Sequence, residues 1–302
     1  MSRPVVAVLD PIHQQAMDRL ARHADVLGPG EADHWRDVAD AVIVRAHPIT
    51  AADVAAAPRL RVVAKHGAGL DNIDVAACEA AGLAVRSTPG VNADSVADLA
   101  LTMALALSRR LVQHTDALRA GEAQRGPQHR GYEVGEMEAG IVGLGAIGSR
   151  VARRLIGGFG APVAAFDPYL ERWPEGVRRV ESLDALLAES RVVFLHVPLD
   201  DETRHLIDAD RIARMRPGAF LVNCARGGIV DEAALAAALH DGRLAGAASD
   251  VFEAEPSFQS PLLAAPNFVA TPHAGAQTHR ALLNVGTAVV DKVLAALQSV
   301  DA

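Results

Sequence analysis

Cysteine and clustered positive charge are both scarce in this sequence. Its two cysteines, Cys78 and Cys224, lie far apart in segments that have the patterns of regular structure. This spacing argues against a disulfide framework and is typical of a reducing compartment, so we expect a cytoplasmic protein. The 29 basic residues are outnumbered by 37 acidic ones, the net charge is −8, and no basic cluster occurs. Because phosphate neutralisation needs such clusters, a nucleic-acid partner is not expected.

Long hydrophobic runs are also missing. The apolar run at residues 5–9 ends at Asp10 and Pro11 and is shorter than the hydrophobic region of a signal peptide. The most apolar longer segment, residues 96–107, is interrupted by Asp98 and stops before two arginines, well under the ~20 residues of a membrane span. We therefore expect neither a transmembrane helix nor a membrane partner.

The 302 residues are 50% apolar and 22% charged, which is typical of a globular chain with one large domain or two ordinary ones. Short β-branched runs alternate with helical patterns, and this alternation favours parallel sheets built from βαβ units. A first group of strands is predicted at residues 5–9, 42–44, 61–64 and 84–86. A second group, forming one six-stranded sheet, is predicted at residues 140–142, 163–166, 192–195, 219–223, 245–249 and 268–270.

The segments between and after these groups indicate how the two sheets are connected. Residues 92–118 keep one apolar face over several turns, which predicts a single long crossing helix, and residues 121–135 predict a loop. Residues 276–298 follow a helical pattern again and are expected to pack on the first group of strands. The second domain, residues 93–275, is thus predicted to be inserted in the first, residues 1–92 and 276–302.

A glycine-rich motif, GLGAIG at residues 143–148, directly follows one predicted strand and opens a helical pattern. In this context Gly143 suits a tight turn, Gly145 the close approach of a pyrophosphate, and Gly148 close packing of helix on sheet. The motif therefore predicts a dinucleotide site. The alternative, that the glycines only form a tight turn, has little weight once strand and helix flank them.

An acidic residue, Asp167, stands 19 positions after Gly148, at the end of the next predicted strand. This is close to the ~20-residue offset at which a carboxylate meets the adenosine ribose hydroxyls, where it would repel a 2′-phosphate. NAD is therefore favoured over NADP. Taken by itself, Asp167 before a proline is also a common start of a turn.

Three polar segments, residues 222–232, 249–256 and 271–276, follow later predicted strands, at the sheet edge where ligands bind in open α/β folds. They supply Arg226 to bind a substrate carboxylate, His273 to transfer a proton to or from a carbonyl oxygen, and Glu255 to orient and charge the imidazole. Each has a simpler interpretation when taken alone. His273 would cap a helix, Glu255 would be a solvated loop residue, and Arg226 would form a surface ion pair.

Together these motifs resemble the NAD-dependent D-2-hydroxyacid dehydrogenases, with local similarity to D-3-phosphoglycerate dehydrogenases. The resemblance extends over nearly the whole chain, since further motifs stand in the family's order at residues 44–45, 66–74, 90–92, 96–98 and 196–199. It implies an α/β fold of two doubly wound parallel-sheet domains, with a Rossmann-type NAD-binding domain inserted in a flavodoxin-like substrate domain.

The resemblance also implies roles for individual residues. Arg226, Glu255 and His273 match the family's catalytic residues, and Asp250 matches an Asp near the nicotinamide carboxamide. Ala68 and Gly69 match a loop whose amides hold the substrate carboxylate, while Arg45 stands where some relatives reach the substrate's far end. No metal is implied. Contacts to NAD are expected from Gly143, Gly145, Ala146, Ile147, Gly148, Asp167, Val197, Pro198, Cys224, Ala225 and Asp250.

The implied function is hydride transfer between NAD and a small D-2-hydroxyacid or 2-ketoacid, of the glyoxylate, hydroxypyruvate or phosphoglycerate type. Relatives that act on phosphoglycerate usually carry a Trp in the loop after the long helix, and residues 121–125 contain none. A NAD-sensing corepressor or scaffold protein on the same fold is the alternative, whereas formate dehydrogenases carry Gln where this chain has Glu255. The apolar surface of residues 92–118 and the resemblance both favour a homodimer.

Overall fold

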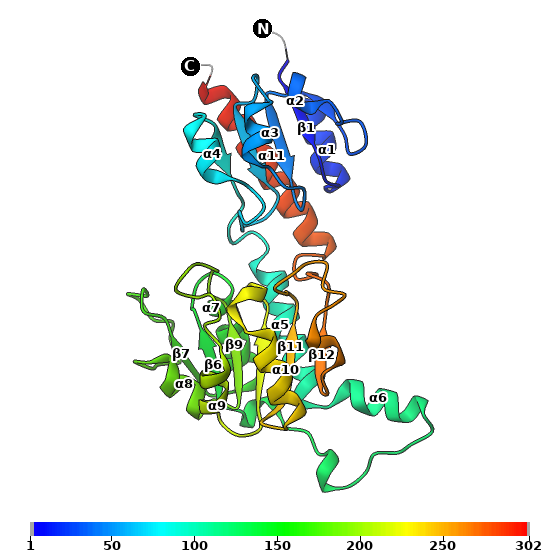
Figure 1. Ribbon diagram of the computed structural model, residues 1–302. Coiled ribbons are helices and arrows are strands. Elements are labelled where there is room, and N and C mark those ends of the chain that lie inside the picture. Colours follow the sequence, from blue (N-terminus) through cyan, green and yellow to red (C-terminus); the bar gives the residue numbers. More distant parts are fainter. Residues whose placement is uncertain (1–2, 301–302) are drawn as a thin grey trace. The chain divides into compact units, whose positions relative to one another are not determined.

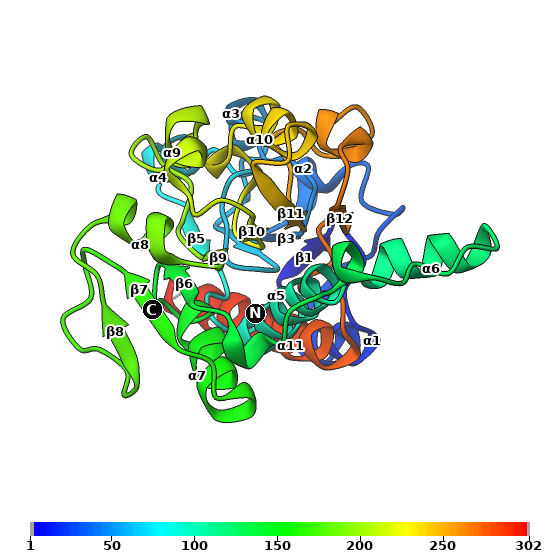
Figure 2. The same cartoon turned by 90° about the horizontal axis from the view of Figure 1, so that it is seen from below.

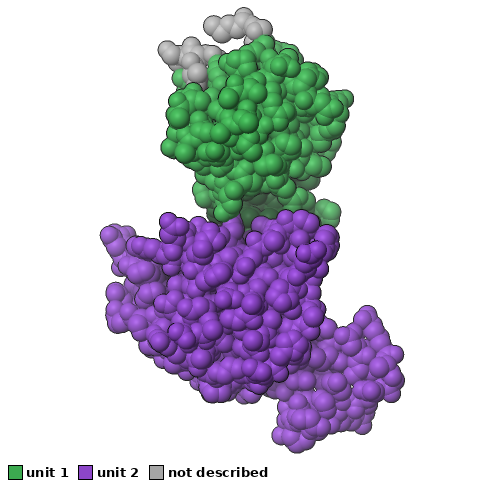
Figure 3. All heavy atoms as spheres, in the orientation of Figure 1, with its two compact units in different colours: residues 1–92, 276–302 green, residues 93–275 purple. Residues whose placement is uncertain are grey.

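The computed structural model describes residues 3–300, and the chain divides into two compact units (Figure 3). Unit 1 comprises Met1–Asn92 and Ala276–Ala302, and unit 2 comprises Ala93–Gly275. Each unit contains one sheet in which every recorded strand pairing is parallel (Figure 1). The α/β fold class with two parallel-sheet domains is therefore confirmed.

The sheet of unit 1 has five strands in the order β2-β1-β3-β4-β5. Because β1 lies between β2 and β3, the order of the strands reverses there, and this creates a switch point at the carboxyl edge between β1 and β3. The strands are β1 (Val5–Val8), β2 (Asp25–Leu27), β3 (Ala41–Val44), β4 (Val62–Lys65) and β5 (Ala84–Arg86).

Side chains of these strands alternate between two buried layers. Val8 and Ile43 pack with α1 (Gln14–Ala21) and α11 (His279–Val300) on one face of the sheet. Val42 and Val63 pack on the other face with three short helices, α2 (Trp35–Val38), α3 (Ala51–Ala55) and α4 (Val75–Ala80). Burial on both faces explains why the strands are continuously apolar rather than alternating.

One helix of unit 1 is long and apolar enough to span a membrane by length and composition, contrary to the expectation from the sequence. Residues His279–Ser299 of α11 reach a mean hydropathy of 1.3, and 44% of that window is buried inside the protein. Val289, Val290 and Val293 lie fully buried against the sheet. We interpret α11 as a core helix of unit 1, because its apolar face is already covered.

The sheet of unit 2 has seven strands in the order β12-β11-β10-β9-β6-β7-β8. The prediction of six strands was wrong because it missed β8, a short edge strand with two charged side chains. Its strands are β6 (Ala139–Val142), β7 (Val163–Phe166), β8 (Val177–Arg179), β9 (Val192–Leu195), β10 (Ala219–Asn223), β11 (Leu244–Ser249) and β12 (Phe268–Ala270).

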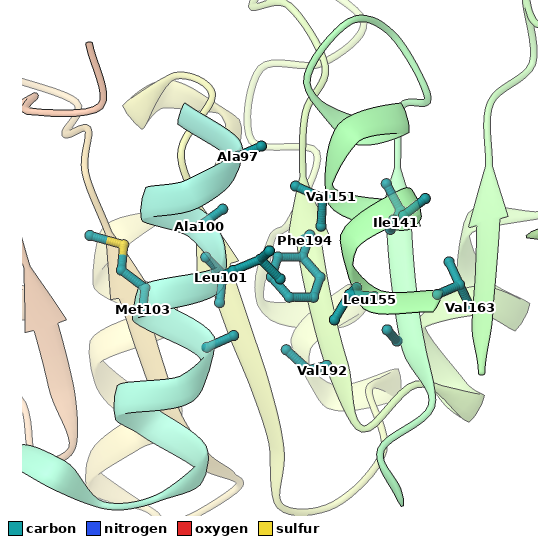
Figure 4. Close-up of a cluster of buried hydrophobic side chains, with 14 of the residues drawn as sticks. Ala97, Ala100, Leu101, Met103, Ile141, Val151, Leu155, Val163, Val192 and Phe194 are labelled. Atoms are coloured by element: carbon teal, nitrogen blue, oxygen red, sulfur yellow. The ribbon is translucent and has the colours of Figure 1, made fainter. Parts of the chain in front are cut away.

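Two helices cover one face of this sheet and three cover the other. Figure 4 shows Phe194 between α5 (Ala93–Ser108) and α7 (Gly148–Phe159), where Leu101 and Leu155 also pack. The opposite face packs against α8 (Leu183–Glu189), α9 (Ala209–Arg214) and α10 (Glu232–His240). Short 3-10 turns occur at η1 (Pro127–His129), η2 (Val134–Glu136), η3 (Gly227–Ile229) and η4 (Pro261–Ala264).

The predicted single helix over residues 92–118 is instead two helices, α5 and α6 (Leu111–Arg119). The chain turns at Arg110, whose φ of 51° is left-handed. A distant segment ends α5, because the Tyr132 amide donates to the Ser108 carbonyl at 2.9 Å and the adjacent Gly131 has no room for a side chain there. As a result, α6 and the loop after it extend away from the body of unit 2 (Figures 1 and 2).

Candidate active site

Six strands of unit 2 end at one level on the carboxyl edge of the sheet. Asn223 of β10 pairs with Ser249 of β11 and with Leu195 of β9, and Leu195 pairs in turn with Val142 of β6. The order of the strands reverses between β9 and β6, which is the place where open α/β sheets bind ligands. Every site residue predicted in unit 2 follows one of these strand ends.

The glycine turn after β6 has the shape that a dinucleotide needs. Gly143 has φ 89°, and a Cβ there would lie 2.7 Å from the His196 carbonyl oxygen. A Cβ on Gly148 would overlap the Gly143 carbonyl, so helix and turn touch through glycine only. A Cβ on Gly145, in contrast, would meet nothing within 4 Å, which leaves open space above the turn.

Backbone amides at the start of α7 face that space. Within residues 3–300, the amides of Gly145, Ala146 and Ile147 donate to no protein acceptor. The helix behind them is 12 residues long, and its amino end favours negative charge. These residues therefore fit the pyrophosphate of a dinucleotide.

The carboxylate of Asp167 is turned toward the glycine turn. Its two oxygens accept the amides of Leu144 at 2.8 Å and Tyr169 at 3.0 Å. The first contact joins the end of β7 to the loop after β6, and the side chain stays half-buried. Asp167 thus has the contacts of a turn residue, as the alternative interpretation has it, and its contact with a ribose stays a prediction.

Backbone segments after β9 and β10 form the rest of this edge. Val197 is half-buried and Pro198 is exposed, and a Cβ on Gly143 would also touch the Val197 side chain at 2.9 Å. Ala225 donates its amide to the Asn223 side chain at 3.0 Å. Cys224 is buried, with its sulfur 3.8 Å from that of Met103, and burial raises the pKa of its thiol. It is therefore an inert thiol whose backbone lines the edge.

Arg226 is placed by the residues on both sides of it. The Asn223 side chain donates to the Arg226 carbonyl at 2.9 Å. Gly227 packs so closely on the backbone of Phe252 that any Cβ would overlap it. This contact brings Arg226 beside the loop after β11, where its positive charge acts on Glu255.

Glu255 and His273 form an ion pair at the same edge. The Glu255 Oε2 atom lies 2.8 Å from His273 Nδ1, and Oε1 accepts the Phe252 amide at 3.2 Å. Burial raises the pKa of Glu255, but the hydrogen bond and charge of His273 outweigh it and hold this pKa below its usual range. The carboxylate thus holds the imidazole at its Nδ1 atom.

The buried carboxylate of Asp250 holds the loop that carries His273. It accepts the Thr271 hydroxyl at 2.5 Å and the amides of Ala274 and Gly275 at 2.6 and 2.8 Å. The His273 amide donates to the Asp250 carbonyl at 2.8 Å, and the His273 backbone is left-handed with φ 54°. Asp250 therefore positions His273, a role that the sequence did not suggest. Thr271, which the sequence analysis also missed, could have been noticed because it directly follows a strand end.

The predicted substrate residues lie in unit 1. Gly67 has φ 140° and is fixed by Thr88, whose amide donates to the Gly67 carbonyl at 2.7 Å. Within the described residues, the amides of Ala68 and Gly69 donate to no protein acceptor, so they are available to an anion. The Arg45 guanidinium likewise forms no hydrogen bond or ion pair with residues 3–300.

Two histidines with buried ring nitrogens precede predicted contact residues. Burial lowers the pKa of His196 to about 3 and, with the charge of Arg45, that of His66 to about 4. Both are therefore neutral at physiological pH. The sequence analysis included both histidines in family motifs but predicted no role for either.

Comparisons with known proteins show which proteins this chain is similar to. The sequence model for the D-isomer specific 2-hydroxyacid dehydrogenase, NAD binding domain, matches residues 101–275. A D-3-phosphoglycerate dehydrogenase from Mycobacterium leprae is 41% identical over 98% of this chain, which spans 57% of that relative's length. A hydroxypyruvate reductase from Thermotoga maritima is 37% identical over 97% of this chain and 98% of its own. The chain thus spans little more than half of the first of these relatives and nearly all of the second.

A solved structure has the same fold over almost its full length. The TT0316 protein from Thermus thermophilus superposes with a TM-score of 0.89 at 34% identity, covering 98% of this chain and 97% of its own.

Proposed function

Because the chain belongs to the D-isomer specific 2-hydroxyacid dehydrogenase family, we propose that it catalyses reversible hydride transfer between NAD and a small D-2-hydroxyacid. The observation that carries this proposal is the Glu255–His273 ion pair beside Arg226, on the same sheet edge as the glycine turn. The edge thus combines an acid–base group, a cation and a dinucleotide cradle.

His273 transfers the proton in this mechanism. NAD, when bound, accepts or supplies the hydride. During reduction the protonated imidazole donates from Nε2 to the carbonyl oxygen, and during oxidation the neutral ring removes the hydroxyl proton. Glu255 holds Nδ1–H, which fixes the ring and stabilises its charged form. Acid catalysis of this kind contributes roughly 10²–10⁴-fold to the rate.

Cationic and amide donors bind the substrate. Arg226 orients the 2-ketoacid by charge-assisted hydrogen bonds and polarises its carbonyl group. The amides of Ala68 and Gly69 hold the carboxylate, and Arg45 binds a polar or anionic group at the far end. The amides of residues 145–147 and the carboxylate of Asp167 hold NAD, with preference over NADP.

The names of two relatives support a class of substrate. The names of those relatives include hydroxypyruvate reductase and D-3-phosphoglycerate dehydrogenase. We propose glyoxylate, hydroxypyruvate or 3-phosphohydroxypyruvate as the oxidised substrate, in the cytoplasm. The loop at residues 121–125, which lacks a Trp, favours the two unphosphorylated ketoacids.

A homodimer is part of the proposal. The helix α6 leaves Leu111 59% exposed and Leu118 70% exposed. Exposed leucines on a projecting helix indicate a surface that is covered in an assembly.

The test is turnover of NADH with a panel of glyoxylate, hydroxypyruvate, pyruvate, oxaloacetate, 2-ketoglutarate and 3-phosphohydroxypyruvate. We expect at least one substrate to give efficient turnover and NADPH to serve less well. If the protein binds NADH tightly and reduces none of the six, the dehydrogenase proposal fails and a NAD-sensing corepressor or scaffold takes its place.

A further inference from the structure

Two loops at the carboxyl edge of unit 1 are bonded into a single piece. The first, residues 45–49, follows β3, and the second, residues 66–73, follows β4. The Asn72 side chain donates to the His47 carbonyl at 2.6 Å, and the Ile49 amide donates to the Asn72 carbonyl at 2.8 Å. The Asp74 amide donates to the Ile49 carbonyl at 2.8 Å. These bonds fix one loop against the other.

A lysine ammonium group reinforces this connection. Lys65 Nζ donates to the Arg45 carbonyl at 2.6 Å and also to Asn72 Oδ1. Charge-assisted hydrogen bonds are about twice as strong as neutral ones, so the junction is stiff. The chain has 27 arginines and only two lysines, Lys65 and Lys292. A compact ammonium with three donors can reach acceptors on two loops where a planar guanidinium fits poorly.

A single carboxylate oxygen fixes the first loop from the other side. Asp10, two residues after the end of β1 at the switch point of the sheet, accepts the amides of Arg45, Ala46 and His47 on its Oδ2 atom at 2.6, 3.0 and 2.9 Å. Burial raises the pKa of Asp10, but these amides and the charge of His47 outweigh it, so the pKa lies below the usual value. The carboxylate is therefore ionised at neutral pH and keeps all three bonds.

The elements held by these bonds are the two anion-binding parts of unit 1. Arg45 carries the cationic side chain, and Ala68 and Gly69 carry the unpaired amides. The two loops start side by side, because Val44 pairs with Lys65 and the His66 amide donates to the Val44 carbonyl at 2.8 Å.

We propose that Asp10, Lys65 and Asn72 are positioning residues that fix the distance between the Arg45 guanidinium and the amides of Ala68 and Gly69. Unit 1 then selects 2-ketoacids by length, because the carboxylate and the far polar group must bind at a set separation. This inference rests on the proposed function, and in particular on Arg45 binding the far end. Glyoxylate has no far group and serves as the internal reference.

The test is a double-mutant cycle between Lys65→Met and Arg45→Ala, measured as kcat/KM with NADH. The probe is the panel ketoacid whose kcat/KM, relative to glyoxylate, falls most in Arg45→Ala. In Lys65→Met we expect this ratio to fall about 10-fold, mainly through KM. In the Arg45→Ala background, Lys65→Met should change the ratio less than about 2-fold, since the group that it positions is gone.

Lys292→Met is the matched control. Lys292 also lies in unit 1 and also donates to a backbone carbonyl, that of Ser87, at 2.6 Å, but it lies outside both loops. The Lys292→Met variant should keep the wild-type ratio of kcat/KM values, probe ketoacid to glyoxylate. If Lys65→Met does not fold, Lys65→Arg replaces it, because this variant keeps the charge and changes only the donor geometry.

Three results would overturn the inference. The first is an unchanged ratio of kcat/KM values, probe ketoacid to glyoxylate, in Lys65→Met. The second is an equal fall of this ratio when Lys65→Met is made in the wild type and in Arg45→Ala. The third is that no ketoacid loses more kcat/KM than glyoxylate in Arg45→Ala. The absence of turnover with all ketoacids in the wild type would instead refute the proposed function. Hydrogen exchange then still tests whether Lys65 fixes the two loops against each other. The amides of residues 45–47 should lose protection together in Lys65→Met and keep it in Lys292→Met.

Discussion

Replacing His273 by Asn tests proton transfer with little disturbance of the fold. The backbone at this position has φ 54°, and Asn adopts left-handed conformations more readily than most residues. The His273 side chain is 51% exposed and that of Glu255 37% exposed, so losing their ion pair changes the free energy of unfolding by at most about 1 kcal/mol. The variant should therefore fold like the wild type.

The expected loss of activity follows from the role of the imidazole. A positioned general acid contributes roughly 10²–10⁴-fold, which corresponds to about 2.7–5.5 kcal/mol of the activation barrier. We expect kcat with the favoured ketoacid to fall by this factor in His273→Asn. The dissociation constant of NADH should not change, because the imidazole is assigned no contact with the cofactor. Loss of NADH absorbance measures the first quantity and NADH fluorescence titration measures the second.

A matched variant, His240→Asn, controls for removing an imidazole from unit 2. His240 ends α10 and is exposed, away from the strand ends that carry the site. It should retain wild-type rates. If His273→Asn folds and keeps turnover within roughly tenfold of the wild type, the assignment of the proton donor is refuted.

Three further outcomes are expected. Glu255→Gln removes the carboxylate that holds His273, so the acid limb that ionisation of this carboxylate gives to the kcat/KM profile for reduction should disappear. In the wild type the low pKa of Glu255 keeps its carboxylate ionised, so the acid limb of the profile should lie below the usual pKa range of a glutamate. Identical pH profiles of the wild type and Glu255→Gln would contradict the pairing of Glu255 with His273. Asp167→Ser with Pro168→Arg should move the preference for NADH toward NADPH, as the ratio of kcat/KM values reports, and equal use of both cofactors by the wild type would show that Asp167 does not select. Sedimentation at micromolar concentration should give twice the chain mass for the wild type and a smaller mass for Leu118→Asp, and a monomeric wild type would exclude the dimer.

The strands that the sequence predicted include all the central ones, whose apolar runs are buried on both faces, together with the edge strands β5 and β12. The short edge strands β2 and β8 were missed, because a three-residue strand such as Val177–Arg179 has almost no pattern of its own and exists through pairing with β7. The break after Ser108 was missed for a related reason. Apolar periodicity continues across Arg110, whereas the contact that ends the helix comes from Gly131 and Tyr132, which are distant in sequence.

At the site, the sequence identified residues by chemistry and missed those that act by geometry. Arg226, Glu255 and His273 were predicted because an arginine, a carboxylate and a histidine after strand ends make a reactive set. Asp10 and Lys65 also lie near strand ends, yet Asp10 accepts backbone amides and Lys65 donates to a backbone carbonyl, and no pattern of side chains in the sequence indicates backbone partners. The position at the carboxyl edge was the one signal that could have pointed to them.

The burial of Asp250 has a consequence for ionic strength. Dissolved ions screen attractions between exposed charges that lie farther apart than the Debye length, which falls from about 8 Å at physiological salt to about 3 Å at 1 M, and they screen buried charges far less. Asp250 itself is buried, and it holds Thr271, Ala274 and Gly275 by hydrogen bonds, so the backbone that carries His273 should keep its shape in concentrated salt. The half-exposed attraction between Glu255 and His273 should fade under the same conditions. Added salt therefore separates two contributions that no single substitution isolates, the placement of the imidazole and the stabilisation of its charge.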